Sequence, residues 1–140
     1  MTSTLLLSDR APVLRYLEAL QAAGELPEAA VNRSALLVLL ADCGHRLHGA
    51  LAVDNVPGTL PQPARVRTLG PLLRRIRSSD HAAAVVLVHL RMGSTEALGG
   101  DAGWCSALSG ASKVAGLTDL GTYVCTPAGA VAVPRDLSAA

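Results

Sequence analysis

The chain has 140 residues, of which 50% are hydrophobic and 16% are charged, and this size and composition suit one compact domain rather than two. They exclude a disordered tail and a fibrous protein. The 12 basic and 11 acidic residues leave a net charge of +1, which excludes a general attraction to nucleic acids or to anionic membrane surfaces.

The longest uninterrupted apolar runs, residues 35–41 and 82–88, are far shorter than the roughly 20 residues that a membrane-spanning helix needs. Residues 1–10 contain three leucines but no basic segment before them, so we expect no secretory signal. The three cysteines lack Cys-x-x-Cys spacing, which is typical of free thiols in a reducing compartment. These features predict a soluble, cytoplasmic protein without a membrane partner.

The first predicted element is a helix over about residues 9–24. Ser8 or Asp9 can cap its start, and Gly24 is a natural end for it. Its apolar residues recur at helical spacing, namely Val13, Leu14, Leu17 and Leu20. Residues 26–33, in which a proline is followed by Glu-Ala-Ala, predict a short helical turn that leads into a sheet.

A β-hairpin is predicted next. Residues 34–42 contain a continuous apolar run of strand length, which favours a strand buried on both faces. Residues 43–46 supply the turn, and residues 47–53 return as a strand with alternating faces. Residues 54–63 hold three prolines and a glycine, and this composition predicts a loop.

The apolar spacing of residues 64–77 predicts a helix that is interrupted or restarted at Gly70-Pro71. Residues 82–90 form a second apolar run and predict a second buried strand in the same sheet as the first. Residues 91–101 are rich in glycine and predict an irregular segment.

Residues 102–115 predict a last helix, and residues 121–126 and 130–133 predict a closing hairpin. This order of elements requires a mixed β-sheet with helices on its faces, which is a three-layer α/β sandwich. We expect seven residues in the core: Leu36, Val38, Leu40, Val86, Val88, Leu108 and Val124.

Residues 85–101, VVLVHLRMGSTEALGGD, join a buried strand that ends in a histidine to a loop that delivers an aspartate to a helix start. Active sites gather at such strand ends. This region resembles the JAB/MPN (JAMM) metalloprotease-like family, in particular its bacterial RadC-like branch. Three further segments carry the resemblance: ALLVLLADCGHRLHGALAVD at residues 35–54, GTL at 58–60 and AGLTDLGTYVCTPAGAVAV at 115–133. It implies a single domain over residues 1–140 with a cytidine-deaminase-like architecture.

The resemblance also implies a site. In the family two histidines and an aspartate hold zinc, and a glutamate acts as general base toward the zinc-bound water. His89 matches the first histidine and Asp101 the aspartate, but Arg91 stands at the second histidine position and Ser34 where the glutamate is expected. Two protein ligands are too few for a catalytic zinc, and a guanidinium repels the cation. The resemblance therefore implies the fold and argues against the hydrolase activity, so no catalytic residue is assigned.

Three functions stay open at this point. The first is a non-catalytic domain, with its metal site lost, that binds a protein partner or a second copy of itself through exposed strand edges. The second is a metal-dependent hydrolase, an isopeptidase or a nuclease, with zinc held by His89, Asp101 and further ligands not yet identified. The third is a DNA-associated module that uses the arginine-rich helix.

The site positions also have structural interpretations. A histidine at the end of an apolar strand is often a hydrogen-bonded structural residue, and Asp101 has the position of a helix N-cap. If Arg91 and Asp101 both project into the former metal cavity, the guanidinium takes the place of the cation and forms charge-assisted hydrogen bonds to the carboxylate. We predict this pairing.

A second candidate metal site consists of Cys43, His45 and His48, which need a fourth ligand from elsewhere to hold a soft metal ion. We expect instead that the turn at residues 43–46 is exposed and free of metal, because a turn tip lacks the surrounding groups that orient ligating histidines. Cys105 and Cys125 have the character of small core residues.

The predicted helix over residues 64–77 has a basic face made of Arg65, Arg67, Arg74, Arg75 and Arg77. Of these, Arg67, Arg74 and Arg75 are the candidate phosphate contacts. No aromatic residue lies between Tyr16 and Trp104, so a stacking platform for single strands is not supported. A solvated or partner-facing helix is the competing interpretation.

Overall fold

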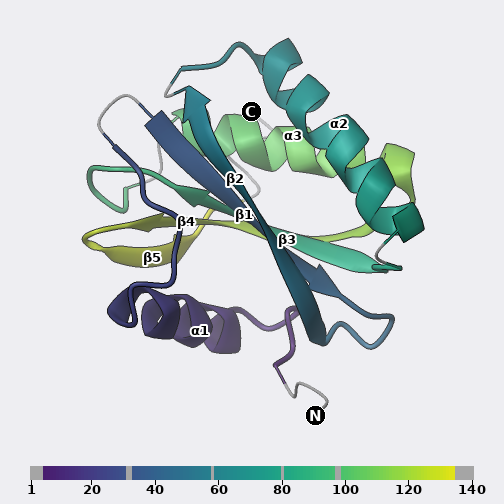
Figure 1. The fold of residues 1–140 in the computed structure, drawn as a ribbon, viewed down its shortest axis with the longest axis horizontal. Coiled ribbons are helices and arrows are strands. Elements are labelled where there is room, and N and C mark those ends of the chain that lie inside the picture. The colour runs from purple at the N-terminus through teal and green to yellow at the C-terminus, as the bar shows by residue number, and fades with distance from the viewer. Residues whose placement is uncertain (1–4, 31–32, 58, 80, 97–98, 135–140) are drawn as a thin grey trace.

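A computed structural model describes residues 5–30, 33–57, 59–79, 81–96 and 99–134. In chain order the elements are α1 (Arg10–Ala22), β1 (Arg33–Ala41), β2 (Leu47–Pro57), α2 (Gln62–Ser79), β3 (Ala84–Leu90), α3 (Gly99–Ala115), β4 (Thr118–Thr126) and β5 (Gly129–Ala132). They form three layers, with α1 on one side of the sheet and α2 and α3 on the other (Figure 1). The predicted three-layer α/β architecture is confirmed at this level.

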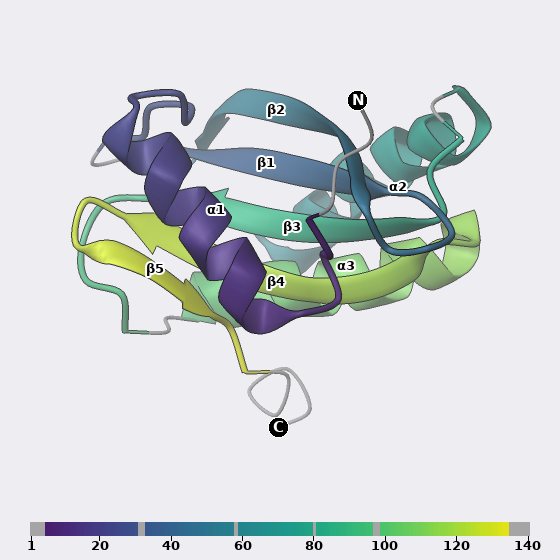
Figure 2. The ribbon, with the colours of Figure 1, turned by 90° about the horizontal axis from the view of Figure 1, so that it is seen from below.

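The strands form one five-stranded sheet in the order β2-β1-β3-β4-β5. All neighbours are antiparallel except β3 and β4, which are parallel and are connected through α3. The two apolar runs thus become the adjacent strands β1 and β3, as predicted. Helices cover both faces of this central pair, and this explains why neither sequence alternates between apolar and polar residues (Figure 2).

Among the described residues, two large hydrophobic clusters and a small third one, which contains Val124, fill the spaces between the layers. On one face, Leu36, Val38 and Leu40 of β1 pack with the buried stripes of α2 and α3. On the other face, Leu37 and Leu39 pack with α1. The prediction of seven core residues is confirmed, because all of them are buried: Leu36, Val38, Leu40, Val86, Val88, Leu108 and Val124.

The hairpin turn between β1 and β2 is organised by Asp42. Its Oδ1 accepts hydrogen bonds from the backbone N–H groups of Arg46, at 3.0 Å, and Gly44, at 2.9 Å. The bond from Arg46, followed by that from Gly44, lowers the pKa of Asp42 below its usual value. His45 has a positive φ of 63° inside this turn, which a short side-chain-capped loop tolerates.

Two predicted elements differ from the structure because packing overrides local signals. The helix α2 runs without interruption through Gly70 and Pro71. Its buried residues Leu69, Leu73 and Ile76 lie on one stripe across the proline, and burial of this stripe offsets the local penalty. The predicted turn at residues 26–33 has no helix in its described residues, and Ala30 instead forms an isolated bridge with Arg33.

The predicted loop at residues 54–63 begins too early, because β2 continues to Pro57. The register between β1 and β2 shifts near Asn55, which has a positive φ of 57°, and Val56 turns into the core beyond this irregularity. The Asp-Asn pair indicated a loop, whereas it marks a bulge within the strand. Two further boundaries lie earlier than predicted, since α3 begins at Gly99 and β4 at Thr118.

Candidate functional site

The candidate site lies where β3 ends on the side of the sheet covered by α3. The register places His89 of β3 opposite Leu36 of β1, and opposite residues of an antiparallel pair share a face. Leu36 belongs to the cluster beneath α2 and α3, so the His89 side chain faces these helices. Arg91 follows two residues later and returns to the same face.

Asp101 meets both side chains from the first turn of α3 and is completely buried. His89 Nδ1 donates to Asp101 Oδ1 at 2.8 Å, because a carboxylate can only accept. Arg91 Nη2 donates to Oδ2 at 2.7 Å, and Arg91 Nε lies 2.9 Å from Oδ1 and 3.2 Å from Oδ2. The predicted pairing of Arg91 with Asp101 is therefore present, as a two-pronged buried ion pair.

The interpretation of Asp101 as an N-cap is wrong, because the helix begins two residues earlier at Gly99. Asp101 is a first-turn residue, where the N-terminal end of the helix dipole favours a negative charge. Its burial is stabilised by this field, by the guanidinium and by the imidazole together.

The guanidinium of Arg91 has an acceptor for every N–H group that it carries. Besides Asp101, Nη1 donates to the carbonyl oxygens of Met92, at 3.0 Å, and Ser94, at 2.8 Å. Nη2 donates to the carbonyl oxygen of Glu96 at 2.9 Å. A guanidinium has five N–H donors, and all five are used here. The loop after β3 is thus wrapped around the Arg91 side chain.

Ser34 lies at the neighbouring position of β1. The register pairs Ala35 with Leu90 and Leu36 with His89, so Ser34 stands one step further along, beside Arg91. The Ser34 side chain is buried, and its Oγ has no hydrogen-bond partner in the described part of the chain. The structure therefore brings His89, Arg91 and Asp101 into direct contact and places Ser34 on the same face.

Two residues of this environment were not found from the sequence. Trp104, one turn after Asp101 on α3, lies with its ring centroid 6.1 Å from that of His89. The guanidinium of Arg65 lies 5.9 Å above the Trp104 ring, a cation–π contact that links α2 to α3. Arg65 also donates to Gln62 Oε1 at 3.0 Å. The sequence feature that could have identified Trp104 is its spacing of three residues from Asp101, because this spacing puts both residues on one helix face.

The residues present do not fit a catalytic zinc. Both oxygens of Asp101 already accept hydrogen bonds from Arg91, and His89 Nδ1 is bound to the same carboxylate. A fixed positive charge 2.7 Å from the carboxylate opposes a cation at this position. Over the described residues, no three His, Cys, Asp or Glu side chains gather closely enough to hold a metal ion.

The second candidate, Cys43, His45 and His48, belongs to the hairpin and is not brought together as a metal-binding group in the described ranges. Cys43 and His48 are exposed, whereas His45 is half-buried. The predicted exposure of the turn is confirmed for Cys43, Gly44 and Arg46.

The three thiols differ in accessibility, and this predicts their reactivity. Cys43 is exposed, Cys105 and Cys125 are buried, and burial raises the pKa of the Cys125 thiol. Because the thiolate is the reactive form, we expect one of the three cysteines to react rapidly with DTNB in the native protein and the other two only after unfolding. A Cys43→Ser variant should lose the rapid phase. Rapid reaction of a second thiol would show that the core is more open than described.

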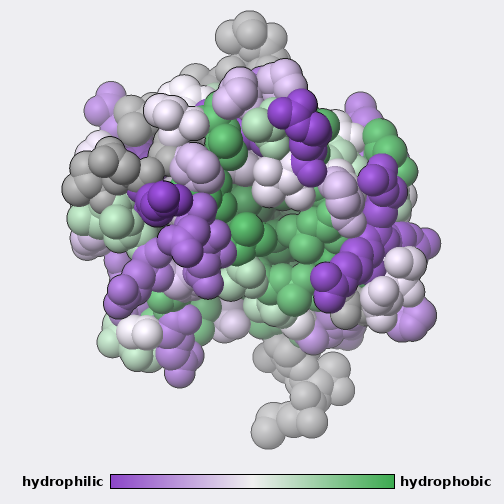
Figure 3. Space-filling view, turned by 45° about the horizontal axis from the view of Figure 1, so that its top comes forward, coloured by the Kyte–Doolittle hydropathy of each residue, from purple (hydrophilic) through white to green (hydrophobic). Residues whose placement is uncertain are grey.

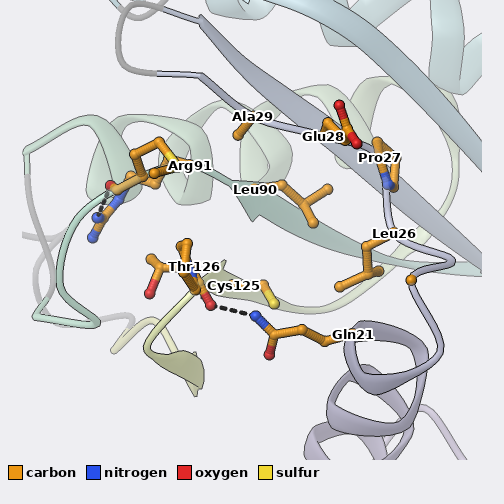
Figure 4. Close-up of a pocket in the computed structure, with 12 residues that line it drawn as sticks. Gln21, Leu26, Pro27, Glu28, Ala29, Leu90, Arg91, Cys125 and Thr126 are labelled. Carbon is orange, nitrogen blue, oxygen red and sulfur yellow. Dashed lines mark hydrogen bonds between the residues drawn. The ribbon is translucent and has the colours of Figure 1, made fainter.

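A pocket of about 280 Å³ lies on the opposite face of the sheet, at the ends of the parallel strands β3 and β4. Leu26, Leu90 and Cys125 face its interior, and the Arg91 guanidinium points away from it (Figure 4). Gln21 Nε2 closes one side by donating to the carbonyl oxygen of Thr126 at 2.6 Å. Arg91 thus belongs to both places, since the residue lines the pocket while its guanidinium is bound to Asp101.

The candidate phosphate contacts Arg67, Arg74 and Arg75 are exposed on α2. The helix has no acidic residue, so its arginines have no intrahelical counter-ion. Arg65 differs from them because its side chain is engaged with Gln62 and Trp104.

No family model matches the sequence, and no curated protein is significantly similar to it. None of the helices in the described ranges combines the length and the apolar character that a bilayer crossing requires.

Proposed function

We propose that the chain is a degenerate JAB/MPN-like domain of the RadC-like branch that catalyses no hydrolysis and acts as a protein-interaction or scaffold module. One observation carries this proposal. Arg91 stands where the family resemblance places a metal ligand, and all of its N–H donors are used by Asp101 and by three loop carbonyls.

The chemistry of these residues supports a structural role for the cluster. A metallohydrolase needs an ion that polarises water and a base that removes its proton. Asp101 is neutralised by the guanidinium, and a serine hydroxyl at position 34 is not a base at neutral pH. The hydrolase alternative would require Arg91 to leave a site in which every one of its donors is satisfied.

The surface supports an interaction role. Figure 3 shows a hollow whose floor is made of hydrophobic residues and whose surroundings are largely hydrophilic. On the side of the sheet covered by α2 and α3, five partly buried side chains border the core, namely Leu51, Val53, Leu60, Leu72 and Ala115. Apolar surface with a polar rim is typical of protein-binding sites.

Metal analysis tests the proposal. After incubation with zinc and desalting, we expect the wild-type protein to retain far less than one equivalent. The Arg91→His/Ser34→Glu variant removes the guanidinium and supplies the missing ligand and base, so it should retain more zinc. Ser34→Glu alone is the matched control, since it keeps Arg91. Near-stoichiometric zinc in the wild type, lost on substitution of His89 or Asp101, would overturn the proposal and favour the hydrolase alternative.

The exposed arginines of α2 favour one second candidate, a DNA-associated module. Phosphate contacts by Arg67, Arg74 and Arg75 would make duplex binding fall steeply with salt, and removal of two contacts should reduce the slope of log K against log salt by about 2. An Arg74→Ala/Arg75→Ala variant measured by fluorescence anisotropy checks this expectation. Binding that is absent, or insensitive to the two substitutions, would eliminate this candidate.

A further inference from the structure

The outer edge of β2 has no strand beside it in the described part of the chain. β1 pairs with β2 on the inner side. The described N-terminal residues meet the start of the strand, where the Leu7 N–H donates to the His45 carbonyl oxygen and the Leu47 N–H to that of Leu5. Beyond Leu47, no backbone hydrogen bond to the outer side of β2 comes from residues 5–30 or from any other described range.

The open part of this edge lacks the usual protection against strand pairing. Proteins guard exposed edges with lysines, prolines, bulges or very short strands. Residues 49–53, Gly-Ala-Leu-Ala-Val, contain neither a charge nor a proline. One register shift lies near His48 at the start of this window, and the irregularity at Asn55 with the proline at position 57 lies beyond its other end. This window is flanked by His48 and Asp54, both exposed.

The window is complementary to itself when it is reversed. In an antiparallel pair of two β2 strands centred on Leu51, each Leu51 faces the other, Ala50 faces Ala52 and Gly49 faces Val53. The same register sets His48 of each copy opposite Asp54 of the other, so that an imidazole can donate to a carboxylate at both ends. Opposite residues share a face, and the side chains of Ala50 and Ala52 are exposed on theirs.

We propose that two copies of this chain associate through their β2 edges, antiparallel and centred on Leu51, which joins the two five-stranded sheets into one. The inference rests on the interaction role proposed above and names its partner, but it uses none of the residues of the Arg91 cluster. The complementarity selects a second copy over an unrelated protein, because only a two-fold axis brings His48 and Asp54 together twice. A register centred on Ala50 would require residues 46 and 47, and Leu47 already donates to the N-terminal segment.

Charge pairs at positions 50 and 52 test both the edge and the register. Sedimentation equilibrium should show a monomer–dimer equilibrium for the wild type at protein concentrations up to about 1 mM. In an Ala50→Lys/Ala52→Lys variant, like charges face each other twice across the pair, and the dimer should weaken. In the matched Ala50→Lys/Ala52→Glu variant, opposite charges face each other, and the dimer should persist. We expect the two dissociation constants to differ by about tenfold or more.

Both substituted positions are exposed, so circular dichroism should show the same fold for the two variants. A wild type that stays monomeric over the whole range would overturn the proposal, and so would equal dissociation constants for the two variants. Zinc retention and the stability of the Arg91 variants do not depend on this edge. A failed dimer with the expected zinc result would therefore reject the self-association alone.

Discussion

The Arg91→Ala variant is expected to lower the free energy of unfolding by about 3 kcal/mol, because it leaves a buried carboxylate without its guanidinium. Asp101 is 0% exposed and Arg91 is 9% exposed, so water cannot replace the lost hydrogen bonds without local opening. The three carbonyl oxygens of Met92, Ser94 and Glu96 lose a donor in the same variant. Denaturant titration followed by the fluorescence of the single tryptophan, Trp104, measures the change.

Two further variants separate the ion pair from a general effect of removing an arginine. Arg74→Ala removes an exposed arginine of α2 and should change the stability by less than about 0.5 kcal/mol. In a double-mutant cycle with Asp101→Ala, the losses at positions 91 and 101 should not add, because each substitution removes the same interaction. If Arg91→Ala lowers the free energy of unfolding by well under 1 kcal/mol, the ion pair contributes little to stability in solution.

Replacement of Trp104 by alanine should destabilise the protein by about 4 kcal/mol, because it empties a large buried volume between the sheet and α2. The side chain is only 2% exposed and contacts both the His89 ring and the Arg65 guanidinium. Circular dichroism is the suitable probe, since the substitution removes the fluorescent residue.

The Trp104→Phe variant is the matched control. It keeps an aromatic ring for His89 and Arg65, so it should cost clearly less than the alanine variant. An additional Arg65→Ala substitution should have a smaller effect in the alanine background than in the wild type, since its aromatic partner is already gone. Equal costs for alanine and phenylalanine would contradict the packing described for this ring.

The buried centre of the fold was the part most open to prediction from the sequence. An apolar run of strand length bounded by polar residues has few ways to be buried, and β1 and β3 follow from this pattern directly. The edge of the sheet was harder, because the Asp-Asn pair in β2 has the composition of a turn. Only the register with β1, which turns Val56 into the core, makes it a strand.

The candidate site was likewise predictable from the sequence only in part. The partnership of Arg91 and Asp101 was predictable from the family resemblance, which places both residues at positions of one metal site. The contact of Trp104 with Arg65 was not, because it depends on how α2 crosses α3. That crossing allows Gln62 to donate to the Gly103 carbonyl oxygen at 2.9 Å, beside the tryptophan. Helix packing of this kind has no short-range signal in the chain.

Because Arg91 balances the charge of Asp101, this pairing does not depend on a supply of ions while the domain is produced and purified. A counter-charge supplied by an ion must be captured from the surroundings, and it exchanges with competing ions and chelators. Here the counter-charge to Asp101 is attached covalently, ten residues away in the same chain. Every copy of the polypeptide therefore contains one Arg91 and one Asp101. Removal of divalent ions by EDTA during purification should therefore leave the contacts among His89, Arg91 and Asp101 unchanged.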